Sequence, residues 1–291
     1  MARITALADR HVVRDGRKFR LKHFHTRDDH AIDKDEAKAL LQQSVERLGD
    51  LQEKLYAQDR WGVLLIFQAM DAAGKDSAIK HVMSGVNPQG CQVYSFKAPS
   101  AEELDHDFLW RTSKALPERG RIGIFNRSYY EETLVVRVHP ELLAKQKLPR
   151  QLVTKRIWNE RYEDINAFER YLARNGFLIR KFFLHVSKRE QRQRFLERLE
   201  RPEKNWKFAA ADLSERARWR DYMDAYEDVI RHTATRHAPW VVVPADDKRI
   251  ARLVVASAVI GAMKELGLAF PEIDDAQRRE LTRARRLLER E

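Results

Sequence analysis

The stretch LLIFQAMDAAGKDSAIKHVM, from Leu64 to Met83, joins an apolar run to a Gly-Lys pair and then to a helix-like segment. A phosphate-binding loop has the pattern Gly, four residues, Gly-Lys and then Ser or Thr, and it lies between a strand and a helix. Here Ala69 stands at the first Gly position, Asp76 at the Ser/Thr position, and the carboxylate of Asp71 lies within the loop. The stretch therefore predicts a phosphate site of unusual, acidic composition.

The position of this loop between a predicted strand and a predicted helix favours phosphate binding. Backbone N–H groups at a loop and helix N-terminus point at an anion, the helix dipole adds positive potential, and Lys75 adds a full charge. An ordinary tight turn of small residues is the weaker alternative. Asp71 is explained if phosphate and metal meet at the loop, because a carboxylate can hold Mg²⁺ or orient an attacking phosphate oxygen. The residues expected to bind phosphate are Ala72, Ala73, Gly74, Lys75 and Asp76.

Alternating apolar runs and amphipathic segments predict the fold. The expected strands are Val63–Phe67, Cys91–Phe96, Ile122–Phe125, Phe177–Val186 and Trp240–Val243. Helices are expected over 36–57, after Gly74, around Tyr162 and Ile165, and through the apolar run that begins at Leu253. Strands that alternate with helices imply a three-layer α/β/α fold with a mostly parallel sheet.

Composition limits the class of protein. The 291 residues carry a formal net charge of +11, which favours a polyanionic partner. No apolar run reaches membrane-spanning length, so no membrane partner is expected. The single cysteine, Cys91, rules out an intramolecular disulfide, and with no secretory signal visible it suggests a cytoplasmic protein.

The chain divides into three parts by composition. Residues 1–35 are polar and are expected to form a solvated, partly ordered arm, in which His23, His25 and His30 are more plausibly solvent-exposed than zinc ligands. Residues 36–270 are expected to form one catalytic domain around the phosphate loop, with the segment at about 194–220 as its lid. Residues 271–291 are expected to be a charged helix or tail.

Two further segments accompany the loop MDAAGKD. RIGIFNRSYYEETLVVRVHPELL, from Arg121, places Asn126 and Arg127 at the end of a buried strand, and RFLERLERPEKNWKFAAADLSERARWRDY, from Arg194, is rich in cations around a Pro. Together the three segments resemble the Walker A, Walker B and lid motifs of the polyphosphate kinase 2 family, over about residues 37–264. FNRSYYEE, where many members carry FDRS, resembles the class III subgroup that phosphorylates both AMP and ADP.

The resemblance implies a P-loop kinase that uses Mg²⁺ to transfer phosphate from inorganic polyphosphate to AMP or ADP, in either direction, so that ATP is also a ligand. It implies a homo-oligomer, and it makes Asp71, Lys75 and Arg127 the catalytic residues, with Arg127 contacting phosphate. One of Glu131 and Glu132 is expected to help hold a second Mg²⁺, and we favour Glu131. Ordinary surface charges are an equally good reading of this pair.

The segment from Lys188 to Lys207 holds eight Lys or Arg and four Glu. Such a run is usually a solvated helix face, but in this context it predicts a lid that excludes water from the transferring phosphate. The expected lid cations are Arg194, Arg198, Arg201, Lys204 and Lys207.

Two other functions fit parts of the sequence. An ATP-dependent nucleoside monophosphate kinase of the thymidylate kinase type would share the fold and the loop, but the acidic Asp71 and the lack of Ser or Thr at position 76 disfavour it. A nucleic-acid-binding module would suit the basic pI, but no aromatic stacking platform is evident, so nucleic acid is not an expected partner.

Overall fold

The structure is a computed structural model, and it describes residues 7–28 and 32–291. Its centre is a six-stranded sheet in the order β1-β6-β5-β2-β4-β3. Five strands run parallel, and β1 pairs antiparallel with β6 at one edge. The strands are β1 (Val12–Val13), β2 (Gly62–Gln68), β3 (Cys91–Ser95), β4 (Ile122–Asn126), β5 (Phe177–His185) and β6 (Trp240–Pro244). The five strands expected from the sequence are present within a residue or two of their predicted ends.

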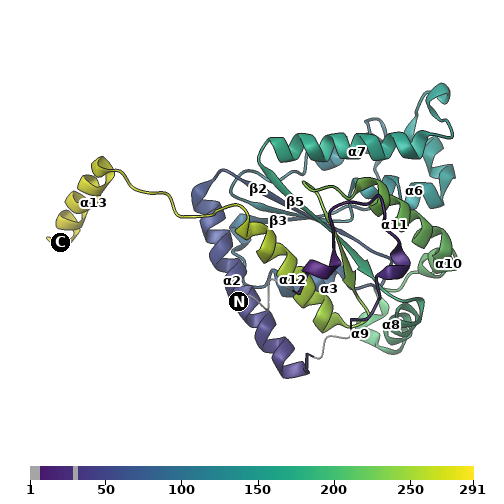
Figure 1. Cartoon of the computed structure of the whole chain (residues 1–291), viewed down its shortest axis with the longest axis horizontal. Coiled ribbons are helices and arrows are strands. Elements are labelled where there is room, and N and C mark those ends of the chain that lie inside the picture. Colours follow the sequence, from purple (N-terminus) through teal and green to yellow (C-terminus); the bar gives the residue numbers. More distant parts are fainter. Residues whose placement is uncertain (1–6, 29–31) are drawn as a thin grey trace.

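Helices cover both faces of this sheet (Figure 1). The helices α2, α3 and α12 pack against one another on one side, and α7, α11 and α6 do so on the other. The larger helices are α2 (Lys34–Gln58), α3 (Lys75–Val82), α7 (Ile157–Arg174), α8 (Lys188–Glu200), α11 (Trp219–Thr233), α12 (Lys248–Lys264) and α13 (Asp275–Leu288). The shorter ones are α4 (Ala101–Leu104), α5 (Trp110–Ser113), α6 (Val135–Val138), α9 (Pro202–Asn205) and α10 (Ala211–Ala217). This is the three-layer α/β/α arrangement predicted from the sequence.

The central strand β2 shows why the sheet forms. Every residue of GVLLIFQ is buried, because β5 and β4 flank the strand and helices cover both its faces. At its start, a side chain on Gly62 would collide with the Phe177 ring. At its end the chain turns into α3 through Gly74, whose φ of 104° lies in the left-handed region that favours glycine.

Helix boundaries follow local capping chemistry. Helix α2 begins two residues before the predicted start, because the Asp33 carboxylate accepts hydrogen bonds from the backbone N–H groups of Asp35 and Glu36. Helix α12 contains the apolar run from Leu253, and twelve of its residues are buried. Within the described residues, no helix is both long and apolar enough to cross a membrane.

The N-terminal segment corrects a prediction. Residues 7–28 do not form a solvated arm: Leu7, Val13, Phe19 and Leu21 are buried in the main core, and Val12 pairs with Val241 of β6. The segment is polar on average, and its few apolar residues are too far apart in the sequence to form a recognisable core pattern. His23 and His25 are exposed, His30 lies outside the described residues, and no metal-binding cluster of His, Cys, Asp or Glu is found in the described part of the chain.

Candidate active site

The carboxyl ends of the parallel strands open into one cavity of about 580 Å³. In an open α/β sheet, ligands bind in the crevice at this edge. The lining comes from five places: the loop after β2 with the start of α3, the residues around Lys97 after β3, the end of β4, the segment of residues 194–207 that includes the second half of α8, and the start of α12. Among the described residues that line it, nine are Lys or Arg and three are Asp or Glu, so the cavity suits a polyanion.

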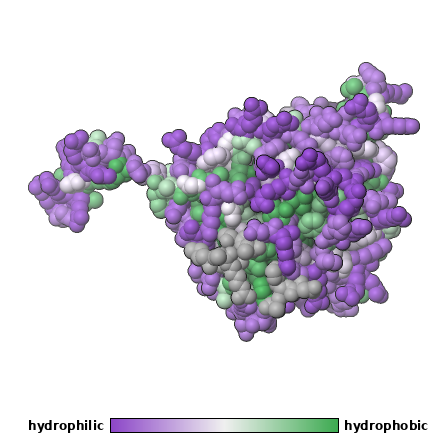
Figure 2. Space-filling view, viewed as in Figure 1, coloured by the Kyte–Doolittle hydropathy of each residue, from purple (hydrophilic) through white to green (hydrophobic). Residues whose placement is uncertain are grey.

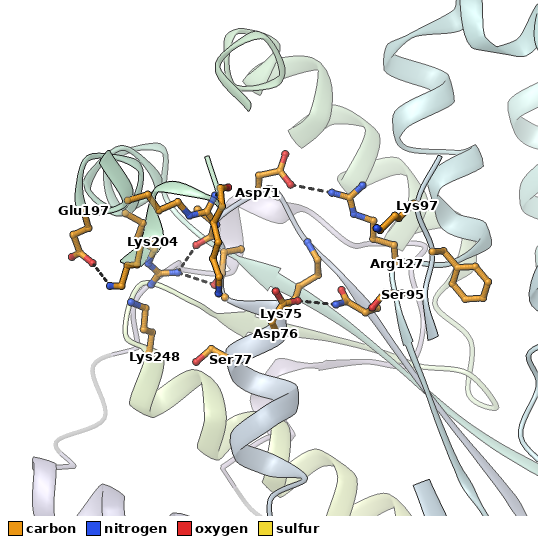
Figure 3. Close-up of a pocket in the computed structure, with 18 of the residues that line it drawn as sticks. Asp71, Lys75, Asp76, Ser77, Ser95, Lys97, Arg127, Glu197, Lys204 and Lys248 are labelled. Carbon is orange, nitrogen blue, oxygen red and sulfur yellow. Dashed lines mark hydrogen bonds and ion pairs between the residues drawn. The ribbon is translucent and has the colours of Figure 1, made fainter. Parts of the chain in front are cut away.

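The loop between β2 and α3 holds the side chains predicted from the sequence (Figure 3). Lys75, the first residue of α3, donates from its Nζ to the backbone oxygen of Ala69 at 3.0 Å. Burial, together with the charge of Arg127, lowers the pKa of Lys75, and the carboxylates of Asp71 and Glu131 oppose this shift. A lysine held in this position supplies a concentrated positive charge at the helix N-terminus.

Arg127 follows directly on β4 and takes a strained conformation, with φ of 64°. Its backbone N–H donates to Phe67 of β2 at 3.0 Å, which fixes its Cα beside the loop. Its Nη2 donates to Asp71 Oδ1 at 3.1 Å (Figure 3), and its Nη1 lies 3.9 Å from Glu131 Oε2. The charge of Glu131, followed by that of Asp71, raises the Arg127 pKa although burial opposes it.

A buried network holds the segment after Arg127 in place. The hydroxyls of Tyr129 and Tyr130 both donate to Glu169 Oε1, at 2.9 and 2.8 Å. Lys181 on β5 donates to the other oxygen of Glu169 at 2.6 Å, and both side chains are fully buried. This network anchors the turn of residues 129–132 to α7 and β5, and thereby limits how far Arg127 can move.

The two carboxylates of that turn differ in position. Glu132 is buried and pairs with Arg161 at 2.9 Å, so it has a structural partner. Glu131 accepts from Gln68 Nε2 at 2.9 Å, lies 3.9 Å from Arg127 Nη1, and is not among the described residues that line the cavity. Asp76 does line the cavity, and it accepts from Asn126 Nδ2 at 2.8 Å.

Arg194 is the best-satisfied cation at the cavity. Its Nη1 donates to the carbonyls of Ala72 and Ala73, its Nη2 to those of Ala245 and Asp246, and its Nε to Glu190. A guanidinium has five N–H donors, and here all five have acceptors. The sequence predicted a lid cation at this position. The structure instead shows a buried brace that joins the phosphate loop to the end of β6.

The helices α8, α9 and α10 lie over one side of the cavity, and their other predicted cations fall into two groups. Arg198, Lys204 and Lys207 line the cavity. Arg201 does not: it is exposed at the junction of α8 and α9, where Pro202 turns the chain. Arg201 is thus not part of the cavity lining in this structure, and its assignment as a lid cation stays a prediction.

Comparison with known proteins fits this geometry. Residues 31–269 match the protein family described as polyphosphate kinase 2. This chain belongs to that family. It is 58% identical, over 86% of each chain, to the ADP-polyphosphate phosphotransferase of Rhodopseudomonas palustris. It is 44% identical to the AMP/ADP-polyphosphate phosphotransferase of Meiothermus ruber, over 90% of this chain and 94% of that one.

A solved structure extends the likeness to the fold. The crystal structure of polyphosphate kinase 2 from Arthrobacter aurescens matches with a TM-score of 0.84 and 41% sequence identity, covering 93% of this chain and 94% of that one. The family predicted from three sequence motifs and the fold predicted from alternating strands and helices are both confirmed.

Several cavity residues were missed by the sequence reasoning. Lys97, Lys248 and Arg252 add three cations, and Arg252 donates from its Nη2 to Ser77 Oγ at 2.9 Å. The available signal was positional: Lys97 follows β3 and Lys248 follows β6, so both lie just beyond strand ends at the ligand edge of the sheet.

Proposed function

We propose that this protein transfers a phosphoryl group between inorganic polyphosphate and an adenine nucleotide. The observation that carries the proposal is the pairing of Asp71 with Arg127 above the Lys75 loop, in a cavity whose lining is dominated by cations. Family membership favours polyphosphate over ATP as the phosphoryl donor, and no observation singles out a thymidylate kinase type of reaction.

In the proposed reaction, a terminal phosphate oxygen of the nucleotide attacks the terminal phosphorus of polyphosphate. The bridging P–O bond to the next phosphate breaks, and the shortened polyphosphate leaves with that electron pair on its oxygen. Lys75 and Arg127 neutralise charge on the transferring group, and catalysis is mainly positioning and electrostatic stabilisation. Lys204 in α9 and Lys207 just after α9 lie in the proposed lid, where they add charge and help exclude water.

The cavity fits a Mg²⁺ ion that is held partly by substrate. Mg²⁺ usually binds through one or two carboxylates together with substrate phosphates, rather than in an all-protein cage. Asp71, with 28% of its side chain exposed, is the carboxylate placed for this role. Glu131, whose Oε2 lies 3.9 Å from Arg127 Nη1, is the second carboxylate proposed for the metal. When bound, the ion supplies charge neutralisation to the phosphate oxygens.

Direct transfer is favoured over a covalent phosphohistidine. Among the described residues that line the cavity there is no histidine, so a nucleophilic imidazole would have to come from outside it. Incubation with ³²P-labelled polyphosphate followed by rapid denaturation tests this. Acid-labile label that remains on the protein would contradict direct transfer.

Nucleotide profiling tests the proposal as a whole. Purified protein is incubated with polyphosphate, Mg²⁺ and either AMP or ADP, and the products are separated by chromatography. We expect ADP from AMP and ATP from ADP, in line with the class III resemblance of FNRSYYEE. A control replaces polyphosphate with GTP. Transfer from GTP but not from polyphosphate would overturn the proposal.

A further inference from the structure

The C-terminal helix α13 (Asp275–Leu288) stands apart from the rest of the protein at the end of the segment that follows α12 (Figure 1). All its residues are exposed. The helix is nevertheless locally encoded: the Asp274 carboxylate accepts from the Gln277 backbone, and the Gln277 side chain accepts from the Asp274 backbone. This reciprocal capping box stabilises a helix start without help from tertiary contacts.

The sequence of α13 segregates two kinds of residue. Arg279, Arg283 and Arg286 are spaced four and three apart, which places them along one face of the helix, and Arg290 continues this spacing two residues beyond the helix end. Leu281, Ala284 and Leu288, with the same kind of spacing, lie along another face. In the space-filling view the helix is mainly hydrophilic with a smaller apolar patch (Figure 2). We call the four arginines the arginine stripe.

The arginine stripe borders a groove of about 520 Å³. Its lining consists of the stripe, Arg278, Thr282 and Leu287, and it includes no carboxylate among the described residues. Arg278 and Arg285 have carboxylate neighbours on the same helix, Asp275 at 3.9 Å and Glu289 at 2.7 Å. No ion pair to a stripe arginine is found within the described part of the chain, so these four guanidinium groups repel one another across successive turns.

We propose that the arginine stripe binds a second segment of the polyphosphate chain, at a distance from the cavity. This inference rests on the proposed function, in which polyphosphate is a substrate. A guanidinium matches phosphate with two parallel N–H···O bonds, and a linear polyanion with a charge on every unit can contact all four arginines at once. Binding would also relieve the repulsion within the stripe.

If the stripe binds polyphosphate, the affinity of the protein for polyphosphate depends on the length of the polyphosphate chain. A short polyphosphate occupies the cavity alone, whereas a long one occupies the cavity and the stripe together. The second contact is then intramolecular, and the affinity for long chains rises without any change at the reacting atoms. The stripe therefore lowers KM for long chains and leaves kcat and short-chain kinetics unchanged.

The test compares two charge-matched variants of the full chain. In the stripe variant, Arg279, Arg283, Arg286 and Arg290 are replaced by Gln, which keeps helix propensity. In the control variant four exposed cations elsewhere, Lys38, Arg60, Arg170 and Arg174, are replaced by Gln. Binding of long-chain and short-chain polyphosphate is measured across a salt series, together with KM and kcat for both lengths. Circular dichroism checks helix content, and light scattering checks oligomeric state.

We expect the stripe variant to bind long chains at least about tenfold more weakly, with a salt slope reduced by about 3 because counterion release from four contacts is lost. Short-chain kinetics stay at the wild-type level, and the control variant changes little. Equal losses in the two variants, or an equal loss with short chains, would overturn the inference. So would an altered oligomeric state, which would assign α13 to a second copy. Binding is read separately from turnover, so an inactive wild-type protein would count against the proposed function and not against the stripe.

Discussion

Ala72 and Arg127 are the two non-glycine residues at the cavity that hold left-handed backbone conformations, with φ of 58° and 64°. Such conformations cost free energy in an L-residue and tend to persist where the surrounding structure imposes them. Here the Ala72 carbonyl is held by Arg194 and the Arg127 N–H by Phe67. The strain accompanies the close approach of the β4 end to the phosphate loop, which brings Arg127 within reach of Asp71.

At the residue scale, Lys75→Ala should abolish transfer while the fold is kept. The substitution removes the charge that faces the transferring phosphate, whereas Lys75 contributes one hydrogen bond to Ala69 and little core packing. We expect kcat to fall at least about 100-fold, comparable to the loss of an electrostatic donor in other active sites. Steady-state kinetics and a circular dichroism melt measure the two effects. Lys80→Ala, at an exposed position on the same helix, is the control. Retained activity in Lys75→Ala would remove Lys75 from the site.

Asp71→Asn should lower the rate sharply and make it respond to metal. Asparagine has nearly the same size but lacks the negative charge that favours Mg²⁺ and pairs with Arg127. We expect kcat to fall about 10- to 1000-fold and to recover partly as Mg²⁺ is raised. A Mg²⁺ titration of the variant, beside the exposed Asp221→Asn, is the measurement. An unchanged rate at ordinary Mg²⁺ would mean that the carboxylate in the loop has another purpose.

At the scale of elements, helix α8 contacts the phosphate loop near its start and α10 near its end. Near its first turns, Gln191 donates to the Asp71 carbonyl at 2.9 Å and Arg194 holds the carbonyls of Ala72 and Ala73. Toward its end, Arg198 reaches Asp212 of α10 at 3.4 Å and lines the cavity. The same helix thus fixes the phosphate loop and leads into α9 and α10, which we propose as the lid.

The Arg194→Lys substitution tests whether the positive charge of Arg194 is sufficient or whether its hydrogen-bonding geometry is also required. Lysine keeps the positive charge, but its single ammonium group cannot satisfy four carbonyls in two directions. We expect a loss of stability of about 2 to 3 kcal/mol, because buried carbonyls lose their donors, together with a lower kcat. Chemical denaturation and kinetics measure these effects, with the exposed Arg189→Lys as control. Wild-type stability in Arg194→Lys would show that charge alone is required.

Lys207→Gln should act on turnover rather than on stability. Lys207 lines the cavity and stacks over the exposed Trp206 ring at 4.9 Å, with no core contact to lose. In the closed site, a cation near the phosphates acts in a lower dielectric than one on the open surface. We expect kcat to fall about tenfold with little change in melting temperature, and Arg189→Gln to leave both near wild type. Equal losses in both variants across a salt series would indicate a diffuse basic surface and not a lid.

At the scale of the whole molecule, the N-terminal segment contacts elements that are distant from it in sequence. The Leu21 N–H donates to Glu227 of α11 at 2.8 Å, and β1 extends the sheet beyond β6. His185, at the end of β5, lies partly buried beneath this segment. A cytoplasmic location and a homo-oligomeric state stay predictions at this scale.

His185 should make the fold sensitive to mild acid. Burial lowers the pKa of His185 to about 4 from its ordinary 6.5, against weaker opposing effects of a Phe24 backbone hydrogen bond and the Asp246 charge. Between these two pH values the unfolded chain binds a proton that the folded chain does not. Stability is therefore complete above pH 6.5 and falls as the pH drops toward 4, by up to about 3 kcal/mol.

Denaturant unfolding at pH 7.0 and 5.0 measures this loss. His185→Gln should flatten the difference between the two pH values, and the exposed His106→Gln should leave it unchanged. An unaltered pH dependence in His185→Gln would assign the acid sensitivity to other groups.

The sequence by itself determined the strands, the loop and the family. Those features depend on short-range patterns: an all-apolar strand, a Gly where φ must be positive, and a Lys at a helix start, as in the stretch from Leu64 to Gly74. These features can be read from the sequence because they depend on residues that are close to one another along the chain. The same logic explains why the caps at Asp33 and Asp274 produce helix starts at those points.

Tertiary structure alone decided which charges reach the cavity and which do not. Arg194 and Arg201 look alike in the basic run, yet one is buried with five acceptors and the other is exposed. Lys97 and Lys248 are far from the loop in sequence and join it because parallel strands end at one edge. Leu7 and Phe19 are isolated in a polar segment and become core residues through contact with distant elements. A side chain's burial and partners depend on which elements pack together, and long-range packing leaves no local pattern in the chain.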